Sequence, residues 1–197
     1  WKLSCRTRLA AQSTALSKAV RVHRMVLSNK PVLLLAIGNE SRGDDAIGPL
    51  LARRLATWQQ KTMRSEAAEV MEAMQLQIEH VLDIEGRELV LLVDAVQGMQ
   101  GPLIFQEAKS AQALSHTSHT LEPEDLLGIF FTVHGRAPPP TFVVCVAGLD
   151  FSLGETLSAE AAANMEQAFF FCQTLLEQPK LETWRKQTRH HPCMKCP

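Results

Sequence analysis

Two adjacent carboxylates, Asp44 and Asp45, follow an apolar run at residues 32–37 and stand where a helix is expected to begin. One aspartate would be enough to cap that helix, because its carboxylate accepts hydrogen bonds from the first free amide groups. A second aspartate beside it adds charge repulsion unless a cation or a hydrogen-bond donor comes to the site. The spacing alone therefore leaves helix capping and a functional carboxylate open for this pair.

A third carboxylate, Asp94, ends a second apolar run of strand length at residues 89–93. Its position allows a structural role, in which it accepts hydrogen bonds from the next loop, or a role in a site. Both apolar runs have the character of strands that are buried on both faces of a parallel sheet. Right-handed crossovers would bring the two strand ends to the same edge, so we expect Asp45 and Asp94 to face one crevice.

Histidines and cysteines supply further candidate ligands. His116 and His119 lie in a polar loop at residues 110–120. A metal site made by one His-x-x-His pair in a loop is uncommon without further ligands, so a solvated loop is also a reasonable interpretation. Cys193 and Cys196, with histidines nearby, have the donor atoms for zinc, but a whole site within a few terminal residues would be strained.

The elements that position these residues alternate between strand and helix. Apolar periodicity and turn residues predict strands at 32–37, 69–74, 89–93, 103–105 and 141–147, and helices at 44–61, 77–85, 122–134 and 158–176. We therefore expect a single-domain α/β fold of three layers, α-β-α, around a mostly parallel twisted sheet of about five strands. Helical spacing also predicts inward-facing side chains: Ile78, Val81, Leu82 and Ile84 on one helix, and Leu126, Leu127, Phe130 and Phe131 on another.

Length and composition agree with one domain, because 197 residues with 46% hydrophobic content suffice for one core of ordinary size. No apolar run approaches the roughly 18 residues that a membrane span needs, so we expect no membrane association. The five cysteines are odd in number and scattered, unlike a disulfide framework. We infer a reducing compartment, the cytoplasm.

The net charge of −1 conceals a strong asymmetry along the chain. Residues 31–178 carry eight basic and twenty acidic side chains, a surface that repels phosphate and makes nucleic acid an unsuitable partner. We expect residues 30–178 to form the domain. The basic segment 1–29 is expected to be disordered, as a targeting segment or as sequence upstream of a start at Met25, and the basic tail 179–197 is also expected to be disordered.

Three separated motifs carry a family resemblance over residues 32–177. The first loop resembles the amino-terminal signature of the nickel-iron hydrogenase maturation peptidases, here Gly38-Asn39, Gly43-Asp44-Asp45 and Gly48, with Ala36 where the family has its first glycine. Val93-Asp94-Ala95 is similar to the family's Val-Asp-Ala, and His119 matches a histidine that precedes a helix. The resemblance implies that Asp45, Asp94 and His119 are metal ligands and favours His119 over His116 as the histidine ligand.

The resemblance also implies a function. The family consists of endopeptidases that remove the C-terminal extension of a hydrogenase large-subunit precursor after nickel insertion, so the nickel arrives with the substrate. This implies a metal-directed hydrolase of aspartic type, with Asp44 or Asp45 receiving a proton and the nickel serving either recognition or catalysis. Glu72 stands where many members have an aspartate, in an altered loop, so the resemblance makes it a further candidate catalytic residue. The segment Gln75-Leu76-Gln77 is similar to the branch that serves NAD-linked bidirectional hydrogenases.

Two other functions are compatible with parts of this pattern, and under each of the three we expect the protein to be a monomer. A nickel-binding hydrogenase assembly factor without proteolytic activity would use the same ligands. A nucleotide-binding domain is disfavoured because Gly38, Gly43 and Gly48 are five residues apart, and because the Asp44-Asp45 pair would repel a pyrophosphate.

Overall fold

A computed structural model describes residues 30–64, 67–110 and 121–188. Its centre is a five-stranded sheet in the order β2-β1-β3-β5-β4. The strands are β1 (Val32–Ile37), β2 (Glu69–Ala73), β3 (Leu89–Gln97), β4 (Leu103–Ala108) and β5 (Thr141–Gly148). β2, β1, β3 and β5 run parallel, and β4 pairs with β5 in the antiparallel direction at the edge. The predicted mostly parallel sheet is confirmed.

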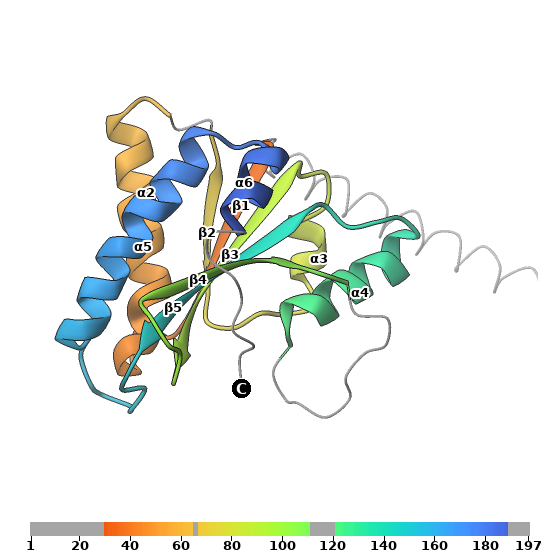
Figure 1. The fold of residues 1–197 in the computed structure, drawn as a ribbon. Coiled ribbons are helices and arrows are strands. Elements are labelled where there is room, and N and C mark those ends of the chain that lie inside the picture. Colours follow the sequence, from red (N-terminus) through yellow and green to blue (C-terminus); the bar gives the residue numbers. More distant parts are fainter. Residues whose placement is uncertain (1–29, 65–66, 111–120, 189–197) are drawn as a thin grey trace, which may run out of the picture.

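Helices cover both faces of the sheet (Figure 1). The helices are η1 (Gly43–Ala46, a 3-10 turn), α2 (Ile47–Lys61), α3 (His80–Asp83), α4 (Pro123–His134), α5 (Ala159–Glu177) and α6 (Leu181–Thr188). In β1, Leu34 packs toward α2 and α5, while its neighbours Leu33 and Leu35 pack toward α3 and α4. Because both faces are covered, every residue of β1 is buried, which explains the unbroken apolar run in the sequence.

Two helices bury less of their surface than the spacing predicted. Only a single turn, α3, forms within 77–85, so Val81 and Ile84 are buried while Ile78 and Leu82 are exposed. On α4, Leu126, Leu127 and Phe130 are buried as predicted, but Phe131 is 57% exposed. A helix that lies on a sheet buries one stripe of its surface, and Phe131 lies outside that stripe.

The expectation that the chain is disordered from residue 179 was wrong for residues 181–188, which form α6. Trp184 is fully buried, with its ring 5.3 Å from that of Phe142, and its Nε1 donates a 3.0 Å hydrogen bond to the Leu175 carbonyl oxygen. One tryptophan provides enough apolar surface to dock a short helix whose other residues are mostly polar. The folded part therefore reaches Thr188. The predicted disorder of 1–29 and of the last residues lies outside the described part of the chain.

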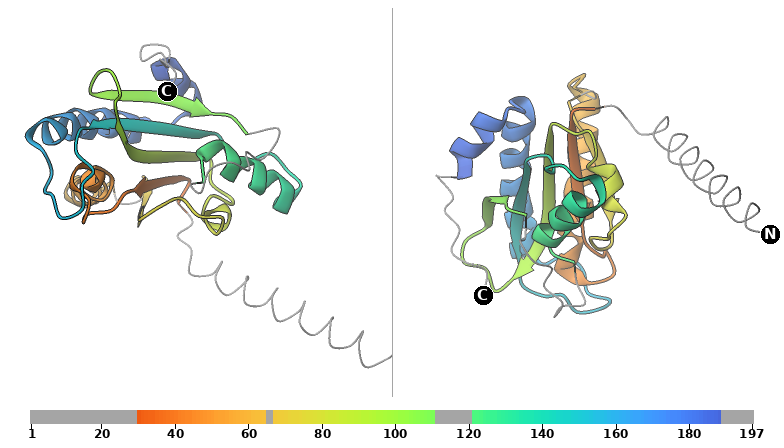
Figure 2. Two further views of the ribbon diagram at one scale, coloured as in Figure 1. Left: turned by 90° about the horizontal axis from the view of Figure 1, so that it is seen from below. Right: turned by 90° about the vertical axis from the view of Figure 1, so that its right-hand side faces the viewer.

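The views in Figure 2 show the same layers, with α6 lying beside β4 at the sheet's edge. This position covers the edge strand, which would otherwise offer unpaired backbone groups. None of the helices that the structure describes combines the length and hydropathy that a membrane span requires.

Candidate functional site

The loop that follows β1 is held close to the strand by glycines. Gly38 has φ of +149°, and a Cβ atom there would lie 2.0 Å from the carbonyl oxygen of Asp45. A Cβ atom on Gly48, in the first turn of α2, would lie 2.0 Å from the carbonyl oxygen of Ile37. Any side chain at either position would force the loop away from the strand. The glycines of the sequence motif thus set the position of Asp45 at the end of β1.

Asp44 is fully buried, and its carboxylate accepts four hydrogen bonds. Oδ2 accepts from the amides of Leu149 at 2.8 Å and Asp150 at 3.1 Å and from Ser158 Oγ at 2.9 Å, while Oδ1 accepts from the Ser158 amide at 2.7 Å. Burial raises the pKa of Asp44, but these hydrogen bonds outweigh burial and hold the pKa below its usual value. These hydrogen bonds stabilise the ionised form of Asp44, so of the two predicted proton acceptors, Asp44 and Asp45, the geometry favours Asp45.

Backbone hydrogen bonds extend this connection between two loops. The amide of Asp44 donates to the Asp150 carbonyl at 2.8 Å, and the amide of Gly154 donates to the Ser41 carbonyl at 2.8 Å. Arg42 Nε donates to the Phe151 carbonyl at 3.2 Å. The loop after β1 and the loop after β5 are therefore one connected unit. Since β1 and β5 flank β3 in the sheet, this unit lies at the carboxyl end of β3.

Asp94 lies in β3, one residue beyond Val93, which pairs with Ala36 of β1. Burial raises the pKa of Asp94 to about 7; the Ala95 amide, which donates to Oδ1 at 2.8 Å, opposes this, and the charges of Asp45 and Glu122 add to it. Burial also raises the pKa of Asp45, against the Asn39 amide and the charge of Arg42. The two carboxyl groups thus interact electrostatically and are partly desolvated, as in many cation-binding and proton-transfer sites.

Glu122 is a member of this group that the sequence reasoning did not identify. It occupies the N-cap position of α4 without making a side-chain cap hydrogen bond, and its charge acts on Asp94. Burial raises the pKa of Glu122, and the charges of Glu124 and Asp125 raise it further. Acidic residues in the first turn of a helix are usually explained by the helix dipole, so the sequence pattern did not single out Glu122 as a site residue.

The histidines cannot be placed beside these carboxylates, because His116 and His119 lie outside the described residues. Within 30–64, 67–110 and 121–188, no three His, Cys, Asp or Glu side chains are close enough together to hold a metal ion. The assignment of His119 as a ligand with Asp45 and Asp94 therefore stays a prediction.

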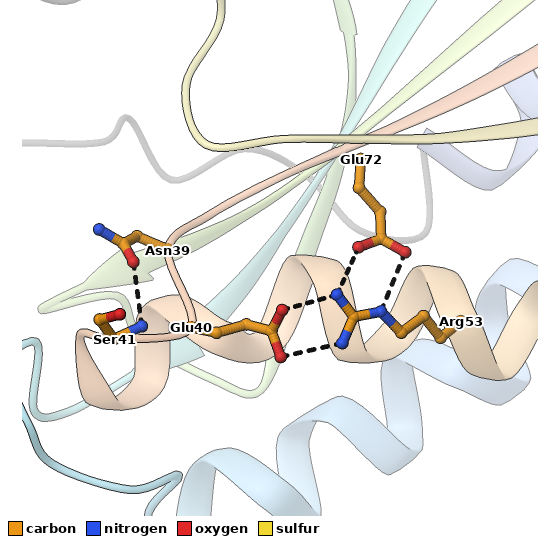
Figure 3. A network of polar contacts seen from close by, with 5 residues as sticks. All are labelled: Asn39, Glu40, Ser41, Arg53 and Glu72. Carbon is orange, nitrogen blue, oxygen red and sulfur yellow. Dashed lines mark hydrogen bonds and ion pairs between the residues drawn. The ribbon is translucent and has the colours of Figure 1, made fainter.

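Glu72 belongs to a different cluster (Figure 3). Arg53 of α2 donates to both oxygens of Glu72 at 3.2 and 2.8 Å and to both oxygens of Glu40 at 2.9 and 2.6 Å. In β2, Val70 packs against the α2 and α5 side, so Glu72, two residues further, shares that face. Asp94 shares the opposite face with Val96. The structure does not bring Glu72 to Asp94, and its oxygens are already paired with a guanidinium, so the predicted catalytic role has no support from the geometry.

No protein-family model matches this chain, and no curated protein sequence matches it. Several solved structures, however, are similar to this chain. A [NiFe] hydrogenase maturation protease HycI from Thermococcus kodakarensis KOD1 is 22% identical over 80% of this chain and 99% of its own, with a TM-score of 0.58. The hydrogenase maturating endopeptidase HybD from E. coli is 17% identical over 75% of this chain and 93% of its own, with a TM-score of 0.57.

A third structure, the hydrogenase 2 maturation peptidase from Thaumarchaeota archaeon SCGC_AB-539-E09, is 22% identical over 75% of this chain and 98% of its own, with a TM-score of 0.53. At this level of identity the likeness is one of fold. This chain is therefore a single α/β domain with the architecture of these proteins, as the sequence predicted.

Proposed function

We propose that this protein is an endopeptidase that removes the C-terminal extension of a [NiFe] hydrogenase large-subunit precursor after nickel insertion. One observation carries the proposal: Asp45, in the turn η1 that follows β1, and Asp94, within the adjacent strand β3, interact electrostatically and have raised pKa values. This pair occurs in a fold that is similar to solved hydrogenase maturation proteases.

The metal in this proposal is the nickel of the substrate. Two carboxylates that repel each other are stabilised when a cation comes between them, so the raised pKa values of Asp45 and Asp94 fit a cation-binding role. Carboxylate oxygens together with the imidazole of His119 form a donor set that suits a divalent transition-metal ion. In this way the enzyme would recognise a precursor that already contains its nickel.

Hydrolysis needs an activated water, because the sequence offers no signature for a serine or cysteine nucleophile. The water oxygen would attack the scissile carbonyl carbon, its proton would pass to a carboxylate, and the leaving amine would take a proton as the C–N bond breaks. Asp45 is the carboxylate we assign to proton transfer, because its pKa is raised whereas that of Asp44 is lowered. A nearby divalent ion would help by polarising the carbonyl.

The partner and setting follow from the same proposal. The partner is the large-subunit precursor, and the protein would bind and cleave it as a monomer in the cytoplasm. The segment Gln75-Leu76-Gln77 favours a precursor of the NAD-linked type, and it lies directly after β2 at the carboxyl edge of the sheet.

Incubation with three forms of a precursor tests the proposal: nickel-loaded with its extension, nickel-free with its extension, and nickel-loaded without it. Only the first should show a mobility shift on a denaturing gel. Firm binding of the nickel-loaded precursor without cleavage would indicate that the protein is a nickel-binding assembly factor and not a protease. Complete processing of the nickel-free form would remove nickel recognition from the mechanism.

A further inference from the structure

A groove of about 430 Å³ lies at the carboxyl edge of the sheet, on the α5 side. Its walls come from the β3–β4 turn, the end of β5 and the first turns of α5. The residues that matter for its chemistry are Met99, Gly148, Leu149, Glu160, Asn164 and Gln167.

The groove adjoins the unit of two loops that Asp44 holds together. Gly148 lines the groove, and a Cβ atom on it would lie 2.9 Å from the Cβ atom of Asp44. The rim is fixed as well, because Gln97 Nε2 donates a 2.8 Å hydrogen bond to the Leu149 carbonyl oxygen. Asp45 follows Asp44 directly, so a polypeptide bound beside Asp45 at this edge of the sheet would lie near the groove.

Two side-chain acceptors of the groove, the Glu160 carboxylate and the Asn164 Oδ1 atom, stand beside the Gln167 amide, which can donate as well as accept. Asn164 is only 8% exposed, and its Nδ2 donates to the Ala147 carbonyl oxygen at 3.0 Å. Its Oδ1 makes no hydrogen bond within the part of the chain that the structure describes. Glu160 is exposed and forms no ion pair with any described residue, and no basic side chain lines the groove. A cationic group is therefore the complementary occupant.

The groove also has apolar surface. Met99 and the half-exposed side chain of Leu149 stand beside the acceptors. Lysine and arginine combine a long aliphatic stem with a charged head, and they bind well where an apolar wall leads to a carboxylate. An acidic side chain would be repelled by Glu160, and an aromatic or short aliphatic side chain would offer no hydrogen-bond donor to the buried Asn164 oxygen.

We propose that this groove binds a lysine or arginine side chain of the polypeptide substrate, with the charged head at Glu160 and Asn164 and the stem against Met99 and Leu149. The proposal rests on the proposed function in one respect, since it takes the substrate to be a polypeptide that lies across the site. It assigns Glu160 to substrate selection and gives it no part in bond cleavage.

A binding experiment tests the groove without any processing assay. The full chain, labelled with ¹⁵N, is titrated with N-acetyl-arginine amide and, separately, with the neutral analogue N-acetyl-citrulline amide. The arginine probe should shift the amide signals of Gly98, Gly101 and Leu149, and the citrulline probe should bind more weakly. Glu160→Gln should weaken the arginine probe about threefold to fivefold, the range for an exposed charge pair.

Glu155→Gln is the matched control, because Glu155 carries the same charge at the same edge but its side chain lies outside the groove. Equal effects of Glu155→Gln and Glu160→Gln, or equal binding of the two probes, would overturn the proposal. In processing assays, Glu160→Gln should raise KM and leave kcat unchanged. If the Glu160→Gln variant processes the precursor with an unchanged KM, the groove proposal fails and the protease function stands. If the arginine probe binds the groove but the protein processes no precursor, the proposed protease function fails.

Discussion

Ser158 donates two hydrogen bonds to Asp44, from its amide to Oδ1 at 2.7 Å and from Oγ to Oδ2 at 2.9 Å, although the two residues are 114 positions apart. The same Oγ accepts a 3.1 Å hydrogen bond from the Ala161 amide and so caps α5. Asp44 therefore connects the loop after β1 to the start of α5. The adjacent aspartates of the motif differ: Asp44 holds two loops together, whereas the charge of Asp45 acts on Asp94.

Asp44→Asn should destabilise the protein by about 2–4 kcal/mol, because the asparagine NH₂ group would face amide donors in a buried site. Urea unfolding measures the change in the free energy of unfolding. Ser158→Ala, which removes one donor and the α5 cap, should cost about 1–2 kcal/mol. Asp45→Asn is the matched control at the neighbouring position and should unfold at nearly the wild-type urea concentration. An Asp44→Asn protein as stable as wild type would contradict the role assigned to this residue.

Asp45→Asn, Asp94→Asn and His119→Ala should each slow precursor processing by at least about 100-fold, because each removes a proposed ligand. All three variants should stay folded by circular dichroism. His116→Ala serves as the control within the same loop and should process nearly normally. The gel assay with nickel-loaded precursor gives the rates, and normal processing by the Asp45 or His119 variant would reject the ligand set.

Asp94→Asn should also stabilise the metal-free protein at neutral pH. The pKa of Asp94 is raised from 3.8 to about 7 in the fold, so the wild type loses stability as the pH rises from about 4 through 7. Asparagine carries no charge and can still accept the Ala95 hydrogen bond. The variant should exceed wild type by roughly 1–3 kcal/mol at pH 8, and the difference should shrink toward zero at pH 4. Thermal unfolding across this pH range measures the difference, and Asp150→Asn is the control at an exposed position. A stability difference between Asp94→Asn and wild type that does not change with pH would contradict the assignment.

Trp184→Ala should destabilise the domain by about 3–5 kcal/mol, because a large buried side chain is removed from the core beside Phe105 and Phe142. A chain that ends at residue 178 should be destabilised at least as much. Arg185→Ala is the control on the same helix: it removes only an exposed ion pair with Glu107 and should cost less than about 1 kcal/mol. Unchanged urea unfolding of Trp184→Ala would mean that α6 does not contribute to the core.

Gly48→Ala should cost about 1–3 kcal/mol and reduce processing, because its Cβ atom would press against the Ile37 carbonyl oxygen and displace the loop that carries Asp45. Gln60→Ala, at an exposed position of the same helix, should leave stability and processing nearly unchanged. Unfolding midpoints and gel rates for the two variants form the comparison. Equal behaviour of Gly48→Ala and Gln60→Ala would show that the close approach of α2 to β1 is not required.

The sequence by itself determined the fold class and the order of the elements. Unbroken apolar runs such as 32–37 and 89–93 are typical of strands in a parallel sheet that helices cover on both faces, and this local property can be read from the sequence without coordinates. The parallel connections then placed the carboxyl ends of β1 and β3 at one edge, so an electrostatic effect of Asp45 on Asp94 was also predictable.

Only the tertiary structure decided which residue of the Asp44-Asp45 pair is buried, that Glu122 acts on Asp94, that Glu72 is paired with Arg53, and that Trp184 completes the core. Each of these depends on contacts between residues that are distant in the chain. Periodicity and turn chemistry describe a residue's own segment, whereas a carboxylate's hydrogen-bond donors and a tryptophan's packing partners are supplied by other segments once the sheet has assembled.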